Sequence, residues 1–155
     1  MQFINYFFAS AISFLGLAIG ICLVKIAPEE QKPLEHSMKI VQGISLVLIF
    51  SFIEFYYFKS WFYLMVFFAY FLFAAFITLS KTGHFRKLMP VYSVLGILFS
   101  LSSANKNLFT IESGLIMIYG IPAAALVYSK KQKNEAKILL SGVIFIAIAV
   151  ILFFA

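Results

Sequence analysis

Long apolar runs separated by short polar connections make up most of the chain. A helix needs about 20 mostly apolar residues to cross a bilayer, because each residue rises about 1.5 Å and the hydrocarbon core is roughly 30 Å thick. Six runs come near this length: Phe3 to Val24, Ile40 to Phe58, Trp61 to Leu79, Leu88 to Ala104, Leu108 to Tyr128 and Ile138 to Ala155. Hydrocarbon offers no partners for free backbone groups, so the runs predict helices. We expect an all-α integral membrane bundle of six transmembrane helices, forming a single polytopic domain over residues 1–155.

Prolines, glycines and polar pairs predict where these helices begin and end. Pro28 cannot continue the first helix, whereas Pro33 fits the first turn of the second. Lys59–Ser60 predicts a tight hairpin between the second and third helices, and Gly83 suits the C-terminal cap of the third. Asn105–Asn107 forms another tight link. The fourth and sixth runs are the shortest, so an error of one span would arise there.

Composition supports a membrane location. Hydrophobic residues make up 63% of the chain and charged residues 12%, against roughly 45–50% and 25% in soluble domains. A water-soluble fold could not hide this much apolar surface, whereas a bilayer can. The formal charge of +6 does not indicate a nucleic-acid partner, because the basic residues lie in the short connections. We expect a multi-pass protein of the cell membrane.

The basic residues also predict an orientation. Ten of the twelve fall in alternate connections and therefore on one side: Lys25, Lys32, Lys39, Lys81, Arg86, Lys87, Lys130, Lys131, Lys133 and Lys137. The other side has only Lys59 and Lys106. Positive residues concentrate in cytoplasmic loops, so both termini should be non-cytoplasmic. The basic side would then contact anionic lipid headgroups.

A small-residue face on the first helix is a candidate packing surface. Gly16 and Gly20 form a GxxxG pair, with Ala9 and Ser13 on the same face. Small residues let two helix backbones approach closely in a membrane. This face would either pack inside the subunit or form a seam with a second copy or another membrane protein.

Two carboxylates within the apolar runs are candidate ion- or substrate-binding residues. Glu54 lies about one turn before the outer end of the second helix, with Ser51 on its face, and Glu112 lies in the first turn of the fifth. Ionisable residues inside a span are costly and often functional. Thr110 as an N-cap and the helix dipole would explain Glu112 structurally. Glu54 lies where the dipole disfavours it, although Lys59 or Lys106 could pair with it. If the two carboxylates meet, they could hold a cation, relay a proton, or act as acid and base.

The fourth helix carries the most polar stripe of the chain. Its members follow spacings of three and four residues: Ser93, Gly96, Ser100, Ser103 and Asn107. The stripe either packs against other helices, with each hydroxyl bonded one turn back, or lines a polar path or ligand site.

The absence of motifs limits the enzyme classes. The chain contains no aspartate, no GxSxG, no CxxC and no phosphate-binding glycine loop. A looser cytoplasmic set comprises Glu29, Glu30, Glu35, His36 and His84. It lacks metal-ligand spacing, so we assign no metal, cofactor or catalytic residue.

Three function classes remain open. We favour a small transporter or channel that uses the outer-side carboxylates. The alternative is an accessory or scaffolding subunit of a larger membrane complex. An intramembrane lipid-acting enzyme is the least favoured.

Overall fold

A computed structural model describes residues 2–57, 84–128 and 134–154, and these are helical apart from short connections. The elements are α1 (Phe3–Ile26), the short 3-10 helix η1 (Pro28–Glu30), α2 (Gln31–Tyr57), α4 (His84–Ser102), α5 (Lys106–Val127) and α6 (Glu135–Phe154). No strand occurs in the described ranges. The expected helix Trp61–Leu79, its hairpin link Lys59–Ser60 and its cap Gly83 lie outside them.

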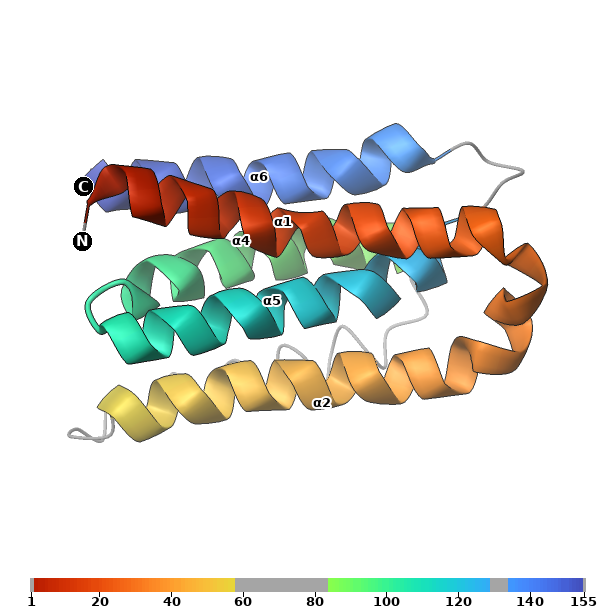
Figure 1. The fold of residues 1–155 in the computed structure, drawn as a ribbon, viewed down its shortest axis with the longest axis horizontal. Helices are drawn as coiled ribbons and strands as arrows, with labels where there is room; N and C mark the ends of the chain where they lie inside the picture. Colours follow the sequence, from red (N-terminus) through yellow and green to blue (C-terminus); the bar gives the residue numbers. More distant parts are fainter. Residues whose placement is uncertain (1, 58–83, 129–133, 155) are drawn as a thin grey trace.

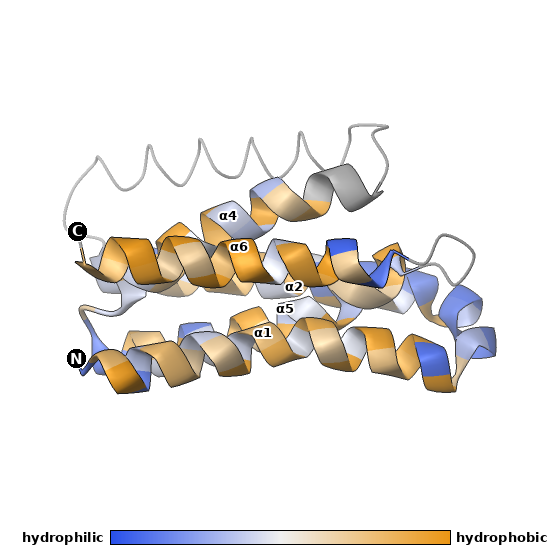
Figure 2. Cartoon of the chain, turned by 90° about the horizontal axis from the view of Figure 1, so that it is seen from above, coloured by the Kyte–Doolittle hydropathy of each residue, from blue (hydrophilic) through white to orange (hydrophobic). Residues whose placement is uncertain are grey.

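Helix length and hydropathy are those of a membrane protein. Within the described ranges, four segments are long and apolar enough to span a bilayer: Phe3–Ile26, Pro28–Tyr57, Lys106–Val127 and Glu135–Phe154. The apolar part of α4, Leu88–Ser102, is shorter. Figure 2 shows apolar residues along most of each helix and hydrophilic residues gathered at one end, around the connection between α1 and α2.

The prolines end and begin helices as expected, but the start of α5 differs. α1 ends at Ile26, and Pro33 lies in the first turn of α2. The expected N-cap Thr110 is wrong, because its hydroxyl donates to the Lys106 carbonyl inside the helix. Asn105 caps α5 instead, since its side-chain oxygen accepts from the backbone N–H of Asn107 and of Leu108. Asparagine is among the strongest N-cap residues, so the helix starts earlier.

Hydrogen bonds between helices establish their directions. The Tyr57 hydroxyl donates to the Leu101 carbonyl at 2.7 Å, so the last turns of α2 and α4 meet and the two helices run the same way. The Tyr6 hydroxyl donates to the Ala149 carbonyl at 2.9 Å, which joins the first turns of α1 to the last turns of α6. The two chain ends therefore lie at the same end of the bundle (Figure 1).

The closest helix contact is the seam between α1 and α5, which run parallel. A Cβ atom on Gly16 would lie 2.0 Å from the Met117 carbonyl oxygen, and one on Gly20 would lie 2.3 Å from the Ile121 carbonyl oxygen. One turn earlier, the Ser13 hydroxyl donates to the Ser113 carbonyl at 3.0 Å. We call this contact the α1–α5 seam. Because α5 covers the GxxxG face within the same chain, that face is not free for a second copy.

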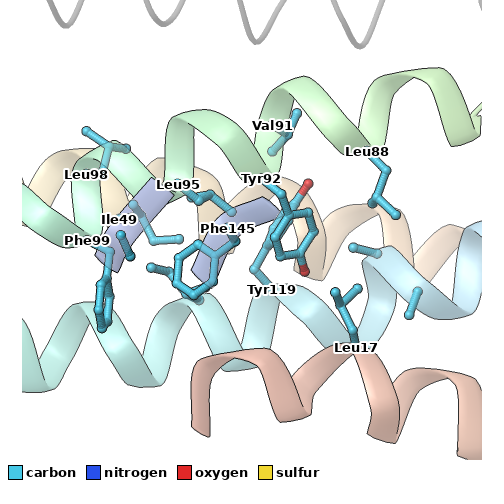
Figure 3. Close-up of a cluster of buried hydrophobic side chains, with 14 of the residues drawn as sticks. Leu17, Ile49, Leu88, Val91, Tyr92, Leu95, Leu98, Phe99, Tyr119 and Phe145 are labelled. Atoms are coloured by element: carbon cyan, nitrogen blue, oxygen red, sulfur yellow. The ribbon is translucent and has the colours of Figure 1, made fainter. Parts of the chain in front are cut away.

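Aromatic side chains fill the space between α1, α4, α5 and α6. Phe99 lies at the centre, with ring centroids 5.1 Å from Tyr6, 4.8 Å from Phe109 and 5.4 Å from Phe145. A Cβ on Gly96 would lie 3.0 Å from the Phe145 carbonyl oxygen, so α4 also approaches α6 closely. Figure 3 shows Phe99 and Phe145 within this buried cluster.

The seam predicts a large effect for one methyl group. Gly16→Ala should lower the free energy of unfolding in detergent micelles by about 1–3 kcal/mol, because the new Cβ meets backbone that cannot move aside without separating the helices. The measurement is reversible unfolding followed by circular dichroism.

Gly114→Ala is the matched control, because a Cβ at Gly114 has no heavy atom within 4 Å. This variant should unfold like the wild type or slightly later, since alanine is the better helix former. Equal stability of the Gly16→Ala protein would contradict the seam.

Candidate functional site

Glu112 is fully buried and has no partner. Its exposed fraction is 0%, and neither carboxyl oxygen has a hydrogen-bond partner. α5 begins at Lys106, so Glu112 lies nearly two turns inside the helix rather than in its first turn. The favourable effect of the helix dipole fades within the first turn. The structural explanation expected for Glu112, a charge beside its N-cap, therefore does not apply.

Neither ion pair in the described part of the chain includes this carboxyl group. Two ion pairs, Lys25–Glu135 and Lys39–Glu35, lie at the opposite end of the bundle. Burying an unpaired polar group costs roughly 1–3 kcal/mol in mutational data, and an unpaired charge costs far more. Glu112 therefore weakens the fold, which indicates a role other than packing.

Glu54 lies toward the same end of the bundle but makes no hydrogen bond to Glu112. It is partly buried, and its Oε1 atom is buried without a partner. α2 and α5 are antiparallel, with the Gln42 side chain bonded to the Tyr119 hydroxyl. Counting along both helices from that bond puts Ile49 opposite Glu112, and Glu54 about five residues or roughly 7 Å nearer the end. The sequence predicted similar depths for the two carboxylates. Along the bundle axis they instead differ by about five residues, or one to two helical turns.

Ser51 does not contribute to a buried site. It is exposed, and its hydroxyl donates to the Val47 carbonyl of its own helix at 2.8 Å. Such back-bonding satisfies a hydroxyl locally and leaves it without a free donor. Ser51 therefore lies on the outer surface of α2, one turn from Glu54 but without access to the interior.

The stripe on α4 is divided among different neighbours. Ser93 donates to the Met89 carbonyl of its own helix at 3.1 Å, and Gly96 packs on α6. Ser100 is partly buried. Ser103 lies beyond the end of α4, and its backbone N–H donates to the Ser100 carbonyl. The members do not form one continuous lining, and Asn107 belongs to α5.

A buried polar track between α2, α4 and α5 was not predicted. The Gln42 side chain donates to the Tyr119 hydroxyl at 3.2 Å, and the Tyr119 ring lies 5.8 Å from that of Tyr92 (Figure 3). The Tyr92 hydroxyl is buried without a partner, and Ser45 is 3% exposed. We use the name polar track for these residues together with Glu112, which hydrogen-bonds none of them and lies about 10 Å from Tyr119 along α5.

Sequence spacing contained the signal for this track. Gln42 and Ser45 are three residues apart and share a face of α2. Glu112 and Tyr119 are seven residues apart on α5, which is about 10 Å along one face. Neither pair stands out until the packing of α2 on α5 is known.

The described residues provide no metal site. No group of three or more histidine, cysteine, aspartate or glutamate side chains comes together among them. Glu29, Glu30, Glu35 and His36 are all exposed, and the His84 side chain lies outside the described part of the chain.

Comparison with known proteins gives no relative. No protein-family model, no curated protein and no solved structure matches the chain. A functional assignment therefore rests on the geometry described above.

The isolation of Glu112 predicts a mutation that stabilises the protein. Glu112→Leu should raise the free energy of unfolding by about 1–3 kcal/mol, because it removes an unsatisfied buried group at similar volume. Chemical unfolding in detergent would measure this change.

Tyr119→Phe is a control that should change the free energy of unfolding in the opposite direction. It removes the hydroxyl that accepts from Gln42 and should lower stability by roughly 0.5–1.5 kcal/mol. A destabilised Glu112→Leu protein would show that Glu112 has a structural role after all.

Proposed function

We propose that this chain is a small multi-pass transporter or channel of the cell membrane that binds an ion at Glu112. The observation that carries the proposal is the complete burial of a carboxyl group without any hydrogen-bond partner. Structural carboxylates inside proteins are normally paired, because the unpaired group destabilises the fold. Ionisable residues within spans commonly mark ion pathways and proton relays.

The polar track supports passage beyond Glu112. Ser45, Gln42, Tyr92 and Tyr119 lie farther toward the end of the bundle where α5 terminates, between helices that are otherwise apolar. Pro122 lies in this part of α5. Proline removes one backbone hydrogen bond and favours bending, so the helix could move here at low cost.

We also propose six spans, with both termini on the non-cytoplasmic side. The common position of the two chain ends supports an even number of crossings (Figure 1). The parallel directions of α2 and α4 support one further crossing between them. The ten-to-two division of basic residues supports the orientation.

The two other function classes have less support. The subunit alternative used the Gly16–Gly20 face as its partner surface, and α5 occupies that face. A lipid-acting enzyme would need a second group beside Glu112, and no described residue hydrogen-bonds its carboxyl oxygens.

Flux through reconstituted protein tests the transport proposal. Proteoliposomes loaded with reporters for protons, sodium, potassium and calcium should show flux of one of these ions with the wild type. Glu112→Gln should reduce it at least about tenfold, the equivalent of one charge-assisted contact.

Ser51→Ala is the control, because Ser51 is exposed and bonded within its own helix. It should leave flux unchanged. Equal flux in the wild type and a well-folded Glu112→Gln variant would contradict an ion-binding role for Glu112.

Cysteine labelling tests the orientation. In a Cys22→Ser background, Lys106→Cys in the first turn of α5 should react with a membrane-impermeant maleimide added to intact cells. Lys32→Cys, exposed at the opposite end, should react only after permeabilisation. The reverse pattern would invert the proposed orientation.

A further inference from the structure

We infer that the ion bound at Glu112 is a proton, carried on its carboxyl group, and not a metal cation. This inference rests on the proposed transport function and specifies its ligand.

Metal cations need several oxygen ligands at once. Calcium takes six to eight and magnesium demands an octahedral shell, whereas no group of three or more histidine, cysteine, aspartate or glutamate side chains comes together among the described residues. Leu108 and Ile116, one turn away on either side along α5, are apolar and fully buried, as is Ile49, which the count along α2 puts opposite Glu112. These described residues supply no further oxygen ligand.

Hydroxyl groups of α1 and α2 that lie along α5 are engaged in hydrogen bonds. Ser13 donates to carbonyl oxygens of Ala9 and Ser113, and Ser45 donates to the Val41 carbonyl. A metal ion would have to break these bonds to recruit ligands. A proton needs only one carboxylate oxygen.

Titratable groups on the helices that pack against α5 do not neutralise Glu112. On α1, Tyr6 donates its hydroxyl to the Ala149 carbonyl. On α2, Glu54 is a second acid and would repel a charged Glu112. On α4, Tyr92 lies near Gly120, two turns away along α5. No described lysine, arginine or histidine hydrogen-bonds the carboxyl oxygens.

A bound proton removes the electrostatic problem directly. The neutral acid in this apolar site costs far less than a lone charge. Release transfers the proton to water, giving carboxylate and hydronium, and the new charge then requires hydration. Because Glu112 is fully buried, water must gain access to its carboxyl group for release.

Infrared spectroscopy of the full chain in lipid bilayers tests the protonation directly. At neutral pH the wild type should show the C=O stretch of a protonated carboxyl, and Glu112→Gln should lack it. Glu54→Gln should keep the band. Glu112→Asp, which keeps a carboxylic acid at this position, should also show a protonated-carboxyl band. The intensity of this band should fall as pH rises, and it should not change when sodium, potassium or calcium is added.

Two results would overturn the inference. One is a spectrum at neutral pH with only carboxylate bands in a folded wild-type protein. The other is a band assigned to Glu112 that disappears on addition of a metal cation at constant pH.

Flux separates failure of this inference from failure of the proposed function. With potassium and valinomycin clamping the membrane potential, a pH-sensitive dye inside proteoliposomes should report proton flux that Glu112→Gln removes. A protonated band without flux of any ion would overturn transport and leave the proton site standing. Sodium flux through a protein whose Glu112 is charged would contradict the inference that the bound ion is a proton. It would still support the proposed transport function.

Discussion

Backbone contact between α1 and α5 is the interaction on which the rest of the bundle depends. Lipid removes most of the hydrophobic drive between helices, so van der Waals packing at close approach must replace it. Gly16 and Gly20 allow this approach because they have no side chain. Two other helices are hydrogen-bonded to this pair. Tyr6 of α1 bonds to α6, and Gln42 of α2 bonds to Tyr119 of α5. Substituting either glycine would therefore disturb more than one interface.

Glu112 lies beside the α1–α5 seam. The Ser113 carbonyl accepts a hydrogen bond from Ser13 of α1, and successive residues of a helix are about 100° apart around its axis. Glu112 therefore lies about a quarter of a turn around α5 from Ser113, and it is fully buried. Turning α5 to expose this carboxyl group would break the contacts of the seam. The tight packing thus maintains an unfavourable group in place, as expected where function and stability conflict.

The sequence predicted the helical architecture better than the site. Apolar runs located the described helices, and Pro28 and Pro33 marked the join between α1 and α2, because these signals are local. Glu112 was found because a charge in an apolar run is conspicuous. Its depth was wrong by more than a turn, since Asn105 and not Thr110 caps the helix. The contact between Gln42 and Tyr119 was missed because it depends on which helices become neighbours. For the same reason, the sequence could not show that the α4 serines contact different neighbours instead of lining one path.

We propose that Glu112 is buried in the bundle with a proton as the partner that neutralises it. The most direct measurement is an experimental structure in lipid nanodiscs, at neutral pH with sodium, potassium and calcium present, at a resolution that shows bound ions. We expect no metal ion and no basic side chain within about 3.5 Å of the Glu112 carboxyl oxygens. A lysine, or a metal cation with several oxygen ligands at that position, would contradict it.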